Sequence, residues 1–136
     1  QGCVLRNNYA ARRGTVFVDQ KALLNISDVS FENNIALASG GAIHSVRGIL
    51  VLENVTFVGN IAGSGGAIYL EGDSIDPVEM KGDILVMTGN SAVCEGSAMT
   101  LQGGIVASLS GSNIYANTIL PASETKLLGL VASCTE

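Results

Sequence analysis

The chain has 136 residues, of which 47% are hydrophobic and only 14% charged, and its formal net charge is −5. This length suits one ordinary domain, and the apolar content favours a packed core over disorder. A negative chain is a poor match for a phosphate backbone, so we expect no nucleic acid partner. No run of 18 apolar residues occurs, so the sequence predicts no insertion into a membrane.

A large apolar residue followed three places later by asparagine recurs along the chain, at intervals of 26, 26, 30 and 27 residues. Recurrence at a nearly fixed period is typical of repeat architectures, in which each unit buries its apolar face only against its neighbours. The pairs are Leu5 and Asn8, Phe31 and Asn34, Phe57 and Asn60, Met87 and Asn90, and Ile114 and Asn117.

A tetrapeptide that begins with glycine follows four of these pairs, and only the fifth unit lacks it. The four are Gly14 to Phe17, Gly40 to Ile43, Gly65 to Ile68 and Gly96 to Met99. This alignment predicts a second interior row made of Phe17, Ile43, Ile68 and Met99. His44 follows Ile43 and would share its position with Val18, Tyr69 and Thr100. If Ile43 points inward, we expect His44 to be an outward-facing surface residue.

Within the units, apolar residues alternate along short segments such as 49–57 and 104–110, which are rich in Val, Ile and Leu. Such alternation predicts strands, and a unit of this length has no room for a 10-residue helix besides its strands. We therefore predict an all-β parallel β-helix of about five coils, with 26–30 residues per coil. Residues 1–136 would be one segment of a longer solenoid, with an insertion loop at 71–83 and an irregular or capping end at 118–136.

In a stacked coil, equivalent residues lie about 4.8 Å apart, one above the other. The five large apolar residues would form one interior row, and the five asparagines would stack at a corner. Asparagine tolerates left-handed backbone geometry, and its amide can bond both to the next amide and to turn backbone. Glycine allows the next corner to turn through angles that a side chain forbids. The motif therefore specifies a corner and not a reaction.

These paired tetrapeptides resemble the polymorphic outer membrane protein repeats of chlamydiae and similar repeats of other bacterial, algal and protist surface proteins. The units 31–43 and 57–68 match the motif in full, those at 5–17 and 84–99 are degenerate, and the resemblance covers roughly residues 5–117. The resemblance implies a right-handed β-helix that is secreted or displayed at the cell surface, with an adhesive or structural role.

Parallel β-helices also include polysaccharide lyases and hydrolases, whose sites need carboxylates that converge from neighbouring coils. The densest acidic stretch holds Glu71, Asp73, Asp76, Glu79 and Asp83. Its spacing fits no EF-hand, and we interpret it as a solvated loop. We expect no catalytic, metal-binding or cofactor-binding residue, and no cofactor.

We therefore predict a non-enzymatic extracellular β-helix that serves as a rod, a filament subunit or a surface-displayed passenger. The expected partners are other copies or neighbouring repeats stacked end to end, and a surface protein or glycan. The alternative is a carbohydrate-active β-helix, which cleaves or binds glycans at a site outside this segment or near residues 71–83. Cleavage of a bound glycan separates the two.

Three cysteines lie far apart in the sequence and form no metal-binding pattern. Cys3 and Cys134 would lie at least four coils apart, or roughly 19 Å, which is beyond the reach of a disulfide. Cys94–Cys134 is therefore the one internal pairing with suitable geometry, and it leaves Cys3 for a partner chain or an upstream cysteine. Asn25 and Asn54 each begin an Asn-x-Ser/Thr motif and are candidate glycosylation sites. Both features agree with an extracellular location.

Overall fold

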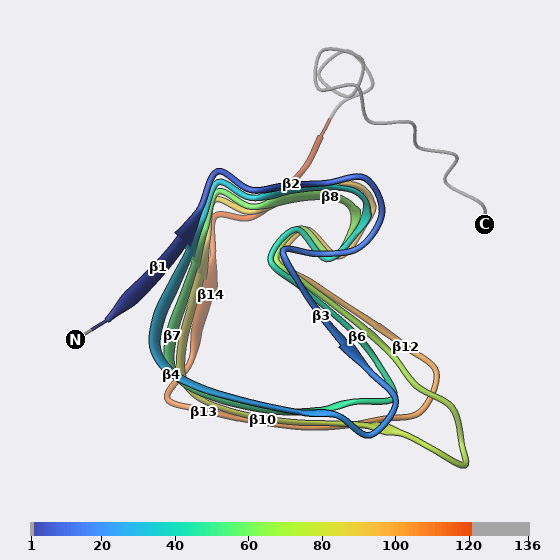
Figure 1. The fold of residues 1–136 in the computed structure, drawn as a ribbon. Coiled ribbons are helices and arrows are strands. Elements are labelled where there is room, and N and C mark those ends of the chain that lie inside the picture. The colour runs from blue at the N-terminus through green and yellow to red at the C-terminus, as the bar shows by residue number, and fades with distance from the viewer. Residues whose placement is uncertain (1, 121–136) are drawn as a thin grey trace.

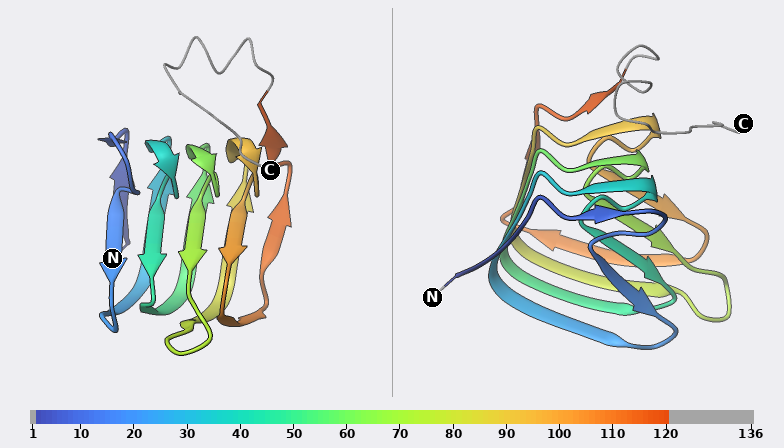
Figure 2. Two further views of the ribbon diagram at one scale, coloured as in Figure 1. Left: turned by 90° about the vertical axis from the view of Figure 1, so that its right-hand side faces the viewer. Right: turned by 45° about the horizontal axis from the view of Figure 1, so that its top comes forward.

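A computed structural model describes residues 2–120, which form fifteen strands in three parallel sheets and no helix. Neighbouring strands in each sheet come from successive coils, so the chain winds into a parallel β-solenoid of about four turns, close to the five predicted (Figure 2). Seen from the N-terminal end, the chain turns clockwise as it recedes, which makes the solenoid right-handed (Figure 1). No helix long and apolar enough to cross a membrane occurs among the described residues.

The largest sheet covers two sides of each coil because its long strands bend in the middle (Figure 1). Each bend falls at a residue with left-handed backbone geometry, Asp28, Asn54 or Ile84, with φ of 55°, 50° and 55°. Asp and Asn adopt this conformation readily, whereas a β-branched residue rarely does. The strands of this sheet are β1 (Cys3–Arg6), β4 (Leu23–Glu32), β7 (Ile49–Val58), β10 (Val78–Thr88), β13 (Ile105–Ser110) and β14 (Asn113–Tyr115).

Two smaller sheets complete each coil, and the chain curls inward between them (Figure 1). The second sheet contains β2 (Tyr9–Ala10), β5 (Ile35–Ser39), β8 (Ile61–Ser64), β11 (Ser91–Glu95) and β15 (Thr118–Ile119). The third contains β3 (Val16–Asp19), β6 (Ile43–Val46), β9 (Ile68–Glu71) and β12 (Met99–Gln102). The paired glycines are required at the inward curl. Gly40 has a φ of 64°, and a Cβ on Gly41 would lie 2.2 Å from the carbonyl oxygen of Gly66 in the next coil.

One interior row runs the length of the solenoid through Leu5, Phe31, Phe57, Met87 and Ile114, which pair in register on successive coils. The rings of Phe31 and Phe57 stack at a centroid distance of 5.2 Å and an angle of 4°. The three middle members of the row are buried, whereas Leu5 is half-buried and Ile114 is 47% exposed. The two ends of the row are therefore less covered than its centre.

The five asparagines Asn8, Asn34, Asn60, Asn90 and Asn117 form a second continuous row, which we call the asparagine ladder. In each step, the backbone N–H and the side-chain Nδ2 of one asparagine both donate to Oδ1 of the next asparagine, at 2.9–3.1 Å. The second Nδ2 hydrogen donates to a main-chain carbonyl of the preceding coil, as from Asn60 to Phe31 at 3.0 Å. Asn34, Asn60 and Asn90 are fully buried, so these bonds satisfy groups that water cannot reach.

The second interior row differs from the prediction in the first coil. Val16, and not Phe17, pairs with Ile43, and Phe17 is 39% exposed. Gly14 lacks the left-handed φ of Gly40. The turn before β3 therefore uses one residue fewer than the next turn, and the strand begins one residue earlier than the glycine alignment implies.

The acidic segment 71–83 contains both a loop and a strand. Glu71 ends β9, residues 72–77 connect the strands, and β10 begins at Val78. The strand begins this early because Val78, Met80 and Gly82 alternate inward and are buried. At the other end, Thr118 and Ile119 form β15, whereas residues 121–136, and with them Cys134 and the predicted Cys94–Cys134 pair, lie outside the described residues.

The asparagine ladder predicts a clear cost for removing one rung. Asn60→Ala leaves the carbonyl of Phe31 and the amide donors of Asn34 unpaired inside the solenoid, and we expect it to lower the free energy of unfolding by about 1–3 kcal/mol. Urea unfolding followed by circular dichroism measures the change. Asn25→Ala, at an exposed asparagine of β4, is the matched control and should leave stability nearly unchanged. Equal stability of the two variants would contradict a structural role for the ladder.

Candidate functional site

The outward side of the third sheet carries a row of large side chains next to the inward curl. Phe17, His44, Tyr69 and Thr100 pair in register on β3, β6, β9 and β12, and we call them the His44 row. The prediction that His44 shares its position with Val18 and lies on the surface is wrong, because it pairs with Phe17 and is only 4% exposed. The curl brings Ser39 within hydrogen-bond distance of the ring, and neighbouring rings pack beside it.

The imidazole of His44 is held on three sides. Its Nδ1 lies 2.8 Å from Oγ of Ser39. The ring meets Phe17 edge-on at a centroid distance of 5.4 Å and lies 4.9 Å from the ring of Tyr69. Nε2 is buried and has no hydrogen-bond partner among the described residues. Position and orientation of this ring are therefore fixed by packing.

The surroundings of His44 favour its neutral form. Burial, and then the positive charge of Arg13, lower the pKa of His44 from 6.5 to about 4, against the opposing effect of the Ser39 hydrogen bond. The Arg13 guanidinium lies 4.5 Å from the centroid of the Phe17 ring, in cation–π geometry. Burial, with smaller effects of Glu71 and Glu95, raises the pKa of Tyr69, whose hydroxyl donates a hydrogen bond to Gln102.

Ser39 and His44 resemble the nucleophile and the base of a catalytic triad, but no described residue completes such a triad. A hydrolase of this type needs a third group that orients the ring and polar donors that hold an oxyanion. Here the second ring nitrogen contacts no described acceptor, and the ring is enclosed by Phe17 and Tyr69. The hydrogen bond to Ser39 therefore fixes the orientation of a buried ring.

The carboxylates of segment 71–83 point to separate partners. Asp73 lies 3.7 Å from Arg47, and Asp76 lies 3.2 Å from Lys21. The backbone N–H groups of Asp76 and Ile75, and then the charge of Arg47, lower the pKa of Asp73. Within residues 2–120, no group of three or more His, Cys, Asp or Glu side chains is placed to hold a metal ion.

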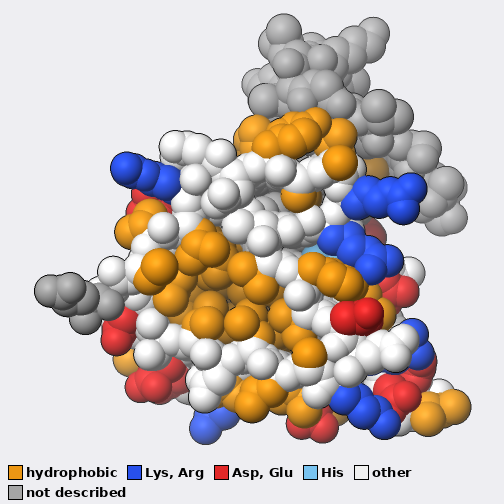
Figure 3. Space-filling view, in the orientation of Figure 1, with side chains coloured by type: hydrophobic (Ala, Val, Ile, Leu, Met, Phe, Trp, Pro, Cys, Tyr) orange, Lys and Arg blue, Asp and Glu red, His pale blue; other side chains and the backbone are white. Residues whose placement is uncertain are grey.

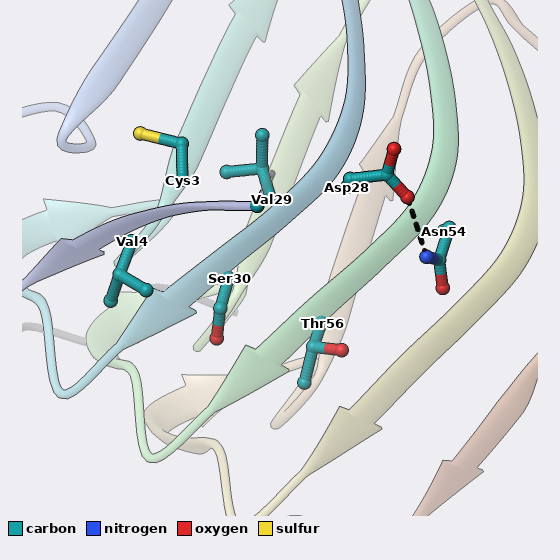
Figure 4. A pocket seen from close by; sticks show the side chains of 8 residues that line it. Cys3, Val4, Asp28, Val29, Ser30, Asn54 and Thr56 are labelled. Carbon is teal, nitrogen blue, oxygen red and sulfur yellow. Dashed lines mark hydrogen bonds between the residues drawn. The ribbon is translucent and has the colours of Figure 1, made fainter.

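A shallow depression lies outside the bend between β1, β4 and β7 (Figure 4). Asn54 and Thr56, the ends of one glycosylation motif, both line it, and Nδ2 of Asn54 donates to Asp28 at 2.7 Å. Asn25, the other candidate acceptor, is exposed on β4. Cys3 also lines the depression, and its thiol is exposed and free. Glycosylation at either asparagine stays a prediction.

The His44 row could not be found from the sequence period alone. Its residues differ in every coil, so the row repeats no motif. The burial of His44 depends on Ser39, which comes near only because the chain curls inward at Gly40. In the sequence, only the pair of glycines before Ile43 points to the burial of His44, because two glycines predict a sharp turn close to this residue.

The low pKa of His44 predicts a loss of stability in mild acid. Between pH 6.5 and 4, the unfolded chain binds a proton at this residue and the folded chain does not, so stability falls as the pH is lowered through this range. We expect a loss of roughly 1–3 kcal/mol from this group. His44→Phe, which copies Phe17 of the neighbouring coil, should remove this part of the pH dependence. Urea unfolding of both proteins at pH 7 and pH 4.5 measures it, and an identical loss in both would contradict the assignment.

Comparison with known proteins gives one match. The family model described as the Chlamydia polymorphic membrane protein repeat matches residues 28–46 and residues 54–71. The two segments cover the complete Phe-x-x-Asn and Gly-Gly-Ala-Ile units and, in the first, His44. No curated protein and no solved structure matches the chain. Two successive coils of this solenoid therefore match the Chlamydia polymorphic membrane protein repeat, as the motif predicted.

Proposed function

We propose that the chain is a non-enzymatic part of a surface-displayed β-helix, which acts as an extracellular structural or adhesive rod. The matched repeats and the solenoid fold fit a surface-type β-helix protein. The finer role rests on how the side chains are divided between the inside and the outside of the coils.

The observation that carries the proposal is a contrast between inward and outward rows of the same strands. The asparagine ladder and the apolar rows repeat one chemistry from coil to coil. The outward rows change: Leu23, Ile49, Glu79 and Val106 occupy one, and Asn25, Val51, Lys81 and Ser108 the next. Repeated residues thus build the rod, and variable residues supply its surface, which suits display better than catalysis.

The disposition of the reactive groups supports a non-enzymatic role. His44 is enclosed and held by Ser39, and the acidic side chains of the 72–77 loop bind basic residues of earlier coils. Glycoside cleavage needs a carboxylic acid and a carboxylate on either side of the scissile bond. Asp73 and Asp76 are instead turned towards Arg47 and Lys21 respectively.

The His44 row is the face that we propose for contact with a partner. Phe17 and Tyr69 present aromatic surface on the coils on either side of His44, and Arg13 adds a positive charge beside Phe17. Aromatic residues and arginine carry much of the binding energy at protein interfaces. The partner would be a protein or a glycan on the surface of another cell.

Adhesion can be tested with the chain immobilised on beads that are exposed to intact cells. Tyr69→Ala should weaken capture by roughly tenfold if the His44 row makes the contact. Tyr115→Ala is the matched control, because Tyr115 is exposed on a different sheet, and it should leave capture unchanged. Both variants must keep the parent melting curve. Equal capture by the parent and both variants would show that the His44 row does not make the contact with cells.

Catalysis is tested separately by incubating the chain with a panel of acidic and neutral polysaccharides and measuring new reducing or unsaturated ends. We expect no product above the level of heat-denatured chain, because Asp73 and Asp76 of the acidic loop are turned towards Arg47 and Lys21. Product release would support the carbohydrate-active alternative. Glu79→Gln and Asp83→Asn would then show whether the outward carboxylates of β10 are responsible.

A further inference from the structure

One side of the solenoid is formed by β13 and by the parts of β4, β7 and β10 that precede the bend (Figure 1). Six outward side chains on this side surround a shallow hollow, and we call them the Lys81 face. They are Ile49 and Val51 on β7, Glu79 and Lys81 on β10, and Val106 and Ser108 on β13. Figure 3 shows this side edge-on along the bottom of the molecule, where orange, blue and red side chains lie together. Apolar and charged groups thus share one exposed surface.

The Lys81 face lies on the flank of the solenoid and not at one of its ends. Coils stack along the solenoid axis, so a further coil covers the first or the last strand of each sheet. The residues of the face point sideways, away from the core, because Leu50 and Met80 between them are the buried members of the alternation. Further coils of the same chain therefore leave this side uncovered.

Half of the Lys81 face is apolar. Ile49 and Val51 are half-buried on the same side of β7, and Val106 is exposed on β13. Apolar side chains that gather on a surface among polar ones are typical of sites where proteins contact one another. The composition of the face is therefore that of a contact surface between proteins.

Glu79 and Lys81 lie at the centre of the face and carry opposite charges. Both are exposed, and they stand two residues apart on β10, or about 7 Å. Glu79 lies between Ile49 and Val106, and Lys81 lies between Val51 and Ser108. Within residues 2–120, neither of the two charges takes part in an ion pair. Each is therefore available to an opposite charge on another molecule.

The order of these charges makes the face complementary to itself. A twofold axis that runs parallel to the solenoid, above Met80, keeps every coil at its height and reverses the direction of the strands. It brings Glu79 of one copy onto Lys81 of the other, and Lys81 onto Glu79. A twofold axis along β10 would instead bring Glu79 onto Glu79 and Lys81 onto Lys81, which is unfavourable because like charges repel. Charge therefore selects the first arrangement.

We propose that two copies of the chain pair side by side through the Lys81 face, with their solenoid axes parallel. Ile49 of each copy then packs on Val51 of the other, beside the two Glu79–Lys81 pairs. Such a contact uses the same patch twice and closes as a dimer. Four strands at about 4.8 Å make the face roughly 19 Å wide, which is small for a protein interface, so the dimer is weak and depends on concentration.

The Lys81 face and the His44 row lie on different sheets, so pairing and adhesion can fail separately. The tests below alter only side chains of the Lys81 face, and binding to cells is read from Tyr69. A dimer without adhesion, or adhesion without a dimer, would therefore show which of the two proposals is wrong.

The experiment exchanges the two charges in the full 136-residue chain. Glu79→Lys places two lysines opposite two lysines in the dimer, and Lys81→Glu places two glutamates opposite two glutamates. In sedimentation velocity over a range of concentrations, the parent should form a dimer, and each single variant should weaken it by roughly tenfold. The double variant, which carries both substitutions, restores opposite charges at both contacts and should dimerise like the parent.

Two control variants separate this contact from an effect of net charge. Glu95→Lys and Arg12→Glu change the net charge by the same amounts as the two single variants, at exposed positions away from the Lys81 face. They should leave the dimer unchanged. Circular dichroism must show that all variants keep the parent melting curve, which we expect because the substituted side chains are exposed.

Three results would each overturn the proposal. A parent that stays monomeric up to its solubility limit would show that the face does not pair. Single variants that dimerise as well as the parent would show that Glu79 and Lys81 do not face each other, as in the arrangement with its axis along β10. A double variant as weak as the single ones would show that the two charges contact other parts of the partner.

Discussion

The hydrogen bonds between asparagines of successive coils are the constraint on which the solenoid depends. The coils of residues 2–120 contain no helix that could fix their corners. The ladder fixes one corner in every coil at the same height and angle, and it satisfies buried amide groups that would otherwise destabilise the fold. Once that corner is set, the apolar rows on either side must come into register, because parallel pairing leaves no alternative that keeps Phe31 over Leu5 and under Phe57.

How much of this could be predicted follows from which features repeat. The interior row through Phe57 and the ladder through Asn60 follow from period and alternation, because every coil solves the same packing problem. Phe17 was misplaced by one residue, because a turn that lacks the second glycine shortens the path without altering the motif that follows. The burial of His44 could not be predicted from the sequence repeat, because it depends on the inward curl and on Ser39, which lies on the other side of that curl. The residues of the outward rows vary from coil to coil, so their contacts can be seen in the structure but could not be predicted from the sequence repeat.

The residues that determine the fold and the residues that form the outer surface are therefore almost separate sets in this molecule. Inward positions accept a narrow range of residues, because each touches the same position above and below it, and a change in one coil is felt in both neighbours. Outward positions such as Val51 and Lys81 share a row without sharing a chemistry. A surface protein that must change what it presents while it keeps its shape gains from this separation, since variation on the outer rows leaves the ladder intact.

The equal spacing of the second and third coils has a consequence for how such a chain can change length. Phe31 and Phe57 are in direct register, 26 residues apart. Duplicating residues 31–56 in frame would join Thr56 to a new phenylalanine in the position that Phe57 now holds, so every inward residue would still meet its equivalent. Such a duplication adds one rise of about 4.8 Å to the rod and leaves the first and last coils unaltered. Unequal recombination between neighbouring repeats would therefore yield longer and shorter rods that fold without any compensating substitution. An odd number of residues inserted within a strand would instead turn the inward residues that follow to the outside.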